Sequence, residues 1–320
     1  MTTKPTETAA NHPESPVDRD VVVVGGGAGG LSAAVFTARY GLDTLVVARG
    51  RSAIHQCAHL ENYLGFPGGV TPERFVALGR TQVEGEGGEV VEDRVVRVAP
   101  ASAAGDGASD PVDAAGGAEP ARFRVETEDG LTLGATYVVA ASAYDGEFLD
   151  AFADDLDRDE ETGFLATEAG RTPVDGLYGV GWLTDETVHQ AVVNAGHGGR
   201  VGVALARDDL RERYWDAVAD RYVDWVVEEG RYGGDGWEEH VDEWFESEML
   251  DGVDVDPETA RRARDDLAAE FLDRQLSSDE KRRRDRLGQR RLLEALDDEV
   301  VRNYAAELDG EDGTVSVNEG

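Results

Sequence analysis

Three residue types are nearly absent from the sequence: it has one cysteine, two methionines and two lysines among its 320 residues. The single Cys57 excludes a disulfide within the chain. Long apolar runs are also missing, and none approaches the roughly 18 residues of a membrane-spanning helix. Residues 1–20 contain no apolar core, so they are interpreted as a polar tail rather than a signal peptide. These absences predict a cytoplasmic protein without a membrane anchor.

Positive charge is scarce as well. The formal net charge is -36, with 67 Asp and Glu against 31 Lys and Arg, and only Lys4 and Lys281 are lysines. Such acidity destabilises a compact state through self-repulsion unless salt screens it, and in molar salt the Debye length falls to about 3 Å. The composition therefore favours a salt-accumulating halophile over an ordinary acidic protein. It disfavours nonspecific binding to nucleic acid or to an anionic membrane, both of which need basic patches.

A glycine-rich turn between a strand and a helix is the clearest motif that is present. The β-branched run Val21–Val24 is followed by Gly25, Gly26, Gly27, Ala28 and Gly30, with Gly25, Gly27 and Gly30 in G-x-G-x-x-G spacing. In a dinucleotide site the first glycine permits the turn, the second lets the diphosphate approach, and the third lets the helix pack closely. The helix N-terminus then favours the phosphates. The alternative is a glycine-rich turn in some other α/β unit.

The second strand, predicted over 43–48, ends without the usual acid. Dinucleotide sites commonly place a carboxylate there for a ribose hydroxyl. This chain has Ala48, followed by Arg49 and Arg51. Because a basic residue at this place suits a 2′-phosphate, an NADP-binding reductase using Arg49 is one alternative function.

The segment Leu60–Val70, with its Glu61-Asn62-Tyr63 core and the helix predicted from Thr71 to about Glu84, resembles the thioredoxin reductase family of FAD-dependent oxidoreductases. Leu64 stands where that family usually has proline. The resemblance implies FAD as cofactor and places Asn62 near the isoalloxazine ring. Without the flanking match, Asn62 would be interpreted as a loop residue that bonds its own backbone.

Further segments extend this resemblance over roughly residues 20–205. Residues 89–98 fit the family's third strand, which implies that Val95 lies against the adenine. A β-hairpin is predicted around Asp129-Gly130, and residues 137–143 fit a later strand. Residues 172–182 resemble the final flavin motif, in which Gly181 is retained while Trp182 replaces the aspartate that bonds the ribityl–phosphate chain.

His189-Gln190-Ala191 is similar to the family's Arg-Gln-Ala element. The resemblance implies that Gln190 and Ala191 begin a helix whose N-terminus points at the flavin, where it can stabilise negative charge. Gly196, Gly198 and Gly202 follow, and without a preceding strand they do not indicate a second nucleotide loop.

Two features of that family are missing from this sequence. The chain passes from 143 through a short acidic stretch, 145–161, where the family inserts a nicotinamide domain of about 100 residues. It also has no Cys-x-x-Cys pair, so it should not reduce disulfides by the family's route. Cys57, between His55 and His59, is a candidate catalytic thiol, because neighbouring imidazolium groups would favour its thiolate form. The alternative is an unreactive loop cysteine. No metal site is predicted, because these three residues lack a fourth ligand.

The domains predicted are a disordered tail at 1–18, a Rossmann-like FAD-binding domain at 19–207 and a helical region at 208–320. The fold class is α/β, a parallel sheet plus a β-hairpin, followed by an α-helical extension. Helices are expected over 210–229, from Trp237, from Asp256 and from Ser277, where Ser277 and Glu280 form a capping box. The basic cluster at 281–291 is expected to pair with its own carboxylates, although it could also dock a partner.

These observations favour an FAD-binding oxidoreductase that is reduced by a separate protein or a small reductant. The alternative from another class is a non-catalytic, degenerate flavin-binding or interaction protein. The expected partners are FAD and an electron-donor protein, with a homodimer left open. Neither nucleic acid nor a membrane is expected to bind.

Overall fold

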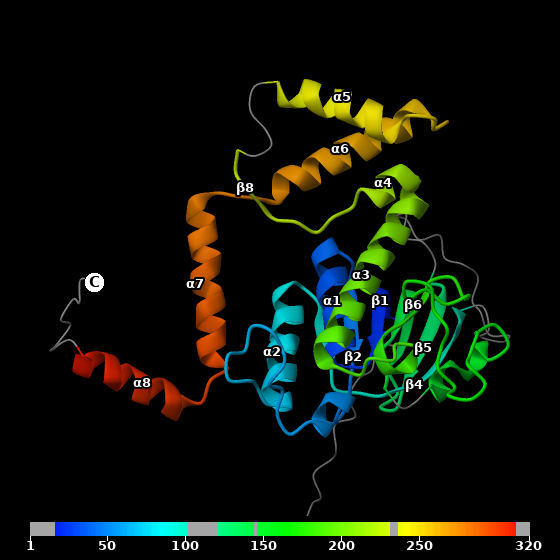
Figure 1. The fold of residues 1–320 in the computed structure, drawn as a ribbon. Helices are drawn as coiled ribbons and strands as arrows, with labels where there is room; N and C mark the ends of the chain where they lie inside the picture. Colours follow the sequence, from blue (N-terminus) through cyan, green and yellow to red (C-terminus); the bar gives the residue numbers. More distant parts are fainter. Residues whose placement is uncertain (1–16, 102–120, 144–145, 231–235, 312–320) are drawn as a thin grey trace, which may run out of the picture. The chain divides into compact units, whose positions relative to one another are not determined.

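The computed structural model describes residues 17–101, 121–143, 146–230 and 236–311 (Figure 1). Residues 1–16 of the predicted tail therefore lie outside the described residues. Within the described part the chain divides after Arg213 into two compact units. Each unit is described by itself below.

The first unit is built on one mixed sheet with the order β3-β2-β1-β6-β5-β4, and β7 pairs with β6. β1 pairs in parallel with β2 and β6, as do β2 with β3 and β6 with β7. β5 is antiparallel to both β4 and β6. The strands are β1 (Val17–Val24), β2 (Thr44–Val47), β3 (Glu89–Val91), β4 (Val95–Pro100), β5 (Phe123–Thr127), β6 (Thr132–Ala140) and β7 (Leu177–Gly179). The predicted α/β class, a parallel sheet plus a β-hairpin, is confirmed.

The run Val21–Val24 is fully apolar because both faces of β1 are covered. Val21 and Val23 face a core shared with α1 (Ala28–Tyr40), α2 (Pro72–Gly85) and α3 (Ala191–Arg213). Val22 and Val24 face a second core that includes the hairpin strands and the 3-10 helix η3 (Glu147–Phe152). Parallel strands buried on both faces are expected to be continuously hydrophobic.

Two strand predictions need correction. Residues 89–98 form two strands, β3 and β4, because Asp93 leaves the sheet and accepts hydrogen bonds from the backbone N–H groups of Arg94 at 2.7 Å and Asp129 at 3.3 Å. The second strand of the hairpin predicted around Asp129-Gly130 and the strand predicted at 137–143 are one strand, β6, that ends at Ala140. The turn at Asp129-Gly130 is where the sequence placed it, and Gly130 has φ +90°.

Two of the glycines after Gln190, Gly198 and Gly202, serve helix packing. Gly198 and Gly202 lie one turn apart in α3 and face α1. A Cβ on Gly198 would lie 2.0 Å from the carbonyl oxygen of Gly29, and one on Gly202 would lie 2.5 Å from Cβ of Phe36. Both contacts are too short for any larger residue, so these glycines set the close approach of α3 to α1.

The second unit is mainly helical, as predicted. It contains α4 (Asp216–Asp220), α5 (Trp237–Met249), α6 (Pro257–Asp273), α7 (Ser278–Glu294) and α8 (Asp298–Glu311), and a two-residue pairing of β8 (Val227–Glu228) with β9 (Gln275–Leu276). The single helix predicted over 210–229 is wrong. α3 ends at Arg213, α4 is one short helix, and Trp215 uses its indole N–H to bond the carbonyl of Met249 at 2.8 Å.

The caps and charges of the later helices follow the sequence. Asp256 caps α6 and Ser277 caps α7, where the Ser277 hydroxyl accepts from the N–H of Glu280 at 3.2 Å. The basic cluster pairs with neighbouring carboxylates, including Arg283 and Arg284 with Glu280. Among the helices described, none has the length and apolar character needed to cross a membrane.

Candidate functional site

The glycine-rich turn joins β1 to α1 with the geometry that its spacing predicts. Gly25 has φ +115°, a conformation that side chains rarely adopt. A Cβ on Gly30 would lie 2.0 Å from the carbonyl oxygen of Gly25, so helix and turn are in direct contact there. Gly27, at the N-cap of α1, has room: a Cβ there would meet only Ser52, at 3.6 Å.

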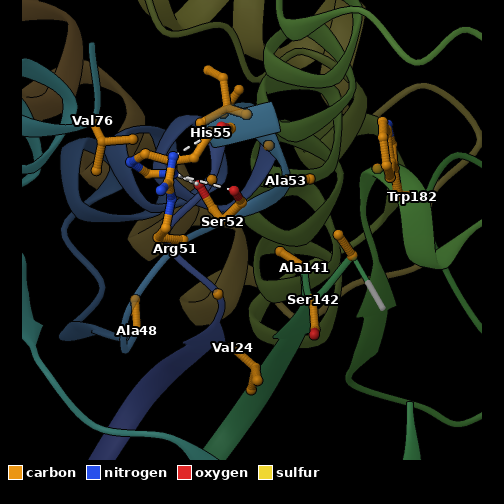
Figure 2. Close-up of a pocket in the computed structure, with 18 of the residues that line it drawn as sticks. Val24, Ala48, Arg51, Ser52, Ala53, His55, Val76, Ala141, Ser142 and Trp182 are labelled. Atoms are coloured by element: carbon orange, nitrogen blue, oxygen red, sulfur yellow. Dashed lines mark hydrogen bonds between the residues drawn. The ribbon is translucent and has the colours of Figure 1, made fainter. Parts of the chain in front are cut away.

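A cavity of about 580 Å³ opens at this turn (Figure 2). Such a volume lies within the range of cofactor sites. It is lined by the carboxyl ends of β1, β2 and β6, the loop after β2, part of α2 and the start of α3. Of the residues singled out in the sequence, it includes Gly25, Gly26, Gly27, Ala28, Cys57, Val95, Gly181 and Ala191. Gly30, Asn62 and Gln190 do not line it.

Asn62 and Gln190 nevertheless meet. The side-chain amide of Asn62 donates to Oε1 of Gln190 at 2.8 Å, across 128 positions of sequence. Both side chains are exposed, and the neighbours of Gln190 on each side, His189 and Ala191, line the cavity. The structure thus joins the two polar residues that the sequence assigned to the flavin ring.

Trp182 occupies the cavity wall where an aspartate was expected (Figure 2). Its ring packs on the imidazole of His189 with centroids 4.4 Å apart. The preceding Gly181 has φ +71°, and its N–H donates to Nδ1 of the buried His197 at 3.3 Å. Burial, with a smaller contribution from Arg200, lowers the pKa of His197. This histidine therefore remains a neutral acceptor that holds the backbone of Gly181.

Arg49 is held by three carboxylates. Its guanidinium donates to Glu128 at 2.8 Å, lies 3.3 Å from Asp93 and also pairs with Asp129. Burial opposes the charged form of Asp93, but hydrogen bonds from Thr127, Arg94 and Asp129 and the charge of Arg49 together lower its pKa. Arg49 is consequently part of a charged network between the loop after β2 and the hairpin.

Cys57 lies at the end of a short 3-10 helix, η1 (Ala53–Gln56), and its side chain is exposed. Of its flanking histidines, His55 lines the cavity and His59 does not. Nδ1 of His55 lies 3.2 Å from the hydroxyl of Ser52. Within the described ranges, no group of three or more His, Cys, Asp and Glu side chains is arranged to hold a metal ion.

Three polar lining residues come from three different elements. Arg51 follows β2, Arg80 lies on α2 and Asn194 lies in the first turn of α3. In the described part of the chain, Nε of Arg80 and Oδ1 of Asn194 are buried and have no hydrogen-bond partner. The sequence analysis named Arg51 together with Arg49, as a basic residue after the second strand. No sequence pattern points to Arg80 or Asn194, because only the packing of α2 and α3 brings them to the cavity.

Comparison with known proteins agrees with this geometry. Residues 20–58, which span the glycine turn and β2, match the family model described as FAD binding domain. The chain is 35% identical over 79 residues to a thioredoxin reductase of Aquifex aeolicus, covering 24% of each protein. It is 34% identical over 83 residues to one of Streptomyces coelicolor, covering 25% of this chain and 26% of that protein. The matched region thus spans about a quarter of these curated relatives.

A solved structure of a thioredoxin reductase from Gloeobacter violaceus superposes with a TM-score of 0.50 at 17% identity, covering 61% of this chain and 96% of that one. At this identity the superposition shows the fold alone. The glycine turn, the sheet and the match over residues 20–58 make the first unit similar to FAD-binding domains of the Rossmann-like type. The comparisons confirm the predicted resemblance to thioredoxin-reductase-like FAD-dependent oxidoreductases, and FAD as the cofactor.

The residues present fit that cofactor. The cavity presents an open glycine at the N-terminus of α1, and two buried polar atoms, Nε of Arg80 and Oδ1 of Asn194, whose hydrogen bonds are unmade among the described residues. Buried polar groups are normally satisfied, so such atoms point to a ligand that supplies the missing partners. The roles of the individual residues toward FAD are taken up as proposals below.

Proposed function

We propose that this chain is an FAD-dependent oxidoreductase that works without a nicotinamide domain of its own and takes electrons from a separate protein or a small reductant. The observation that carries this proposal is the direct parallel pairing of β6 with β7. Only residues 141–176 connect these strands, and their described part contains η3 and isolated bridges. A nucleotide domain of about 100 residues has no room in that connection.

The absence of a Cys-x-x-Cys pair in the sequence supports the same proposal. Dithiol exchange needs two neighbouring thiols, and Cys57 is the only cysteine. Electrons would therefore leave or enter the cofactor directly rather than through a protein disulfide.

When bound, FAD supplies the two-electron transfer chemistry. Gly27 and the free N–H groups of α1 would hold its diphosphate, and Val95 would pack on the adenine. Asn62 and Gln190, joined at 2.8 Å, would fix the polar edge of the ring system. Because Ala191 begins α3, the partial positive charge of that N-terminus would stabilise negative charge on the reduced ring.

An NADP-binding reductase that uses Arg49 is less well supported. The guanidinium already contacts Glu128, Asp93 and Asp129, so a 2′-phosphate would have to displace carboxylates from it.

A non-catalytic FAD-binding protein is the second candidate, and Trp182 favours it. In place of an aspartate that could hold the ribityl chain, the cavity presents an indole packed on His189.

The deciding experiment is the visible spectrum of the full chain purified in molar KCl. We expect a flavin absorption band with nearly one FAD per chain. Colourless protein that takes up no added FAD would refute the proposal. Titration with NADPH should then bleach the flavin only slowly, whereas a small chemical reductant should bleach it fully. Rapid stoichiometric bleaching by NADPH would contradict the proposed need for a separate donor.

Two glycine variants test the cofactor placement. Gly27→Leu inserts a side chain into the cavity at the N-cap of α1 and should abolish FAD retention. The control is Gly196→Leu in α3, where a Cβ would meet nothing within 4 Å and the residue does not line the cavity. A Gly27→Leu protein that stays yellow would show that the cofactor is bound elsewhere.

A further inference from the structure

The cavity is basic although the chain is strongly acidic. Four arginines line it, Arg49, Arg51, Arg80 and Arg94, and Asp93 is the one carboxylate among the described lining residues. The whole chain carries a net charge of -36. Since Arg49 is already neutralised by three carboxylates, Arg51 and Arg80 are the residues to consider for an anionic ligand.

Arg51 is held beside the start of α1. The next residue, Ser52, is the one that a Cβ on Gly27 would meet, at 3.6 Å from the Ser52 Cβ. The loop is fixed by Arg51 itself, whose Nη2 donates to the carbonyl of His55 at 3.1 Å, and by the contact between Ser52 and His55 (Figure 2). Within the described residues, no carboxylate pairs with Arg51.

Arg80 reaches the same cavity from α2. Val76, one turn earlier on that helix, also lines the cavity. The adjacent Gly79 packs against α1, since a Cβ there would lie 2.9 Å from Cδ1 of Leu31. Nε of Arg80 is buried without a partner in the described part of the chain, and an unsatisfied buried donor is destabilising.

We infer that Arg51 and Arg80 form a clamp on the diphosphate of the cofactor, in the cavity at the N-terminus of α1. The inference rests on the proposed function, in which this cavity holds FAD. A diphosphate carries two negative charges, and two planar guanidinium groups can each donate paired hydrogen bonds to phosphate oxygens. The clamp gives Nε of Arg80 the acceptor that it lacks. It also explains how the cofactor is retained where Ala48 and Trp182 replace the two usual acids.

The clamp makes the diphosphate, rather than the flavin or the adenine, the group that these arginines recognise. The test uses Arg51→Gln, Arg80→Gln and the double variant of the full chain. Arg74→Gln is the matched control, because Arg74 lies on α2 but does not line the cavity. Dissociation constants are measured by calorimetry for FAD, for ADP and for adenosine, which has no phosphate.

We expect each single variant to bind FAD and ADP about tenfold more weakly than the wild type, and the double variant about a hundredfold more weakly. Each tenfold step corresponds to about 1.4 kcal/mol. Adenosine binding should be unchanged in all variants, and Arg74→Gln should match the wild type throughout. The melting temperature without ligand is recorded for each variant, so a general loss of fold is recognised. Arg80→Lys should recover part of the affinity lost in Arg80→Gln, because it restores the charge but not the paired donors.

Unchanged affinity for FAD and ADP in both single variants would overturn the clamp while leaving the proposed function standing. An equal loss for adenosine would overturn it too, since the effect would then not lie at the diphosphate. If the wild type bound ADP but not FAD, the proposed function would fail, and the ADP series would still decide whether Arg51 and Arg80 hold a diphosphate.

Discussion

The two units of this chain use their apolar residues in different ways. In the first, β1 is buried completely from Val21 to Val23, and two cores cover the two faces of the sheet. In the second, α7 buries no residue in the described structure, and Leu292, Leu293 and Tyr304 are each more than half exposed. The first unit is thus specified by tight packing around a cofactor cavity, whereas caps and charge pairs specify the helices at the end of the second.

Glycine substitutions should separate the units most strongly. Gly30→Ala places a methyl group 2.0 Å from the Gly25 carbonyl and should destabilise the first unit by about 3–5 kcal/mol. Gly288→Ala in α7 has nothing within 4 Å and should instead stabilise its helix by about 0.5–1 kcal/mol. Chemical denaturation followed by circular dichroism measures both. Equal effects would erase the distinction between the units.

Leucine truncations should give the next largest difference. Leu205 in α3 is fully buried, so Leu205→Ala should cost about 2–5 kcal/mol. Leu293→Ala in α7 removes a side chain that is 54% exposed and should change stability by less than about 0.5 kcal/mol. The denaturation midpoints of the two variants give the comparison. A large cost at Leu293 would reveal that this face of α7 is covered in solution.

Tryptophan fluorescence offers a readout specific to the first unit. Trp182 lines the cavity, while Trp225 is exposed in the second unit. Because a bound flavin quenches nearby indoles, Trp182→Phe should remove most of the quenching that FAD causes, and Trp225→Phe should retain it. Titration of each variant with FAD in the same buffer checks this. Quenching that persists in Trp182→Phe would place the flavin away from the cavity wall.

The pH dependence should be the smallest effect. The folded pKa of His197 is lowered by burial, so the unfolded chain binds the proton more readily. This histidine therefore contributes stability above its unfolded pKa of about 6.5, and the contribution is lost as the pH falls through the lower folded value. We expect the wild type to lose more stability between pH 8 and pH 5 than His197→Asn, measured by denaturation. A steeper loss in the variant would assign the acid sensitivity to other groups.

Much of the first unit could be predicted from sequence because its signals are local. The run Val21–Val24 and the glycine spacing fix a strand, a turn and a helix within twenty residues. The break at Asp93 could not be foreseen, since it depends in part on the N–H group of Asp129, which lies in the hairpin turn. In the second unit, periodic aromatics predicted one helix over 210–229, but the bond from Trp215 to Met249 ends that periodicity through a partner distant in sequence.

The same limit applies to the site. Gly25 and Gly181 adopt positive φ angles, and Gly27 leaves open space at the start of α1, so a local motif can identify all three. Arg80 and Asn194 reach the cavity only because α2 and α3 pack on α1. The residues next to them in the sequence form no pattern that predicts this position. The packing role of Gly198 could not be predicted from sequence either, because the group it packs against is the carbonyl of Gly29.

That contact between Gly198 and Gly29 has a consequence for biosynthesis. The ribosome makes the glycine turn early, but the wall formed by Gly181, Ala191 and Asn194 emerges only after most of the first unit has been translated. Until α3 has docked on α1, the cavity of the nascent chain lacks this wall. Cofactor loading must therefore be a late event. FAD would bind to the finished first unit rather than to its first strand and helix alone.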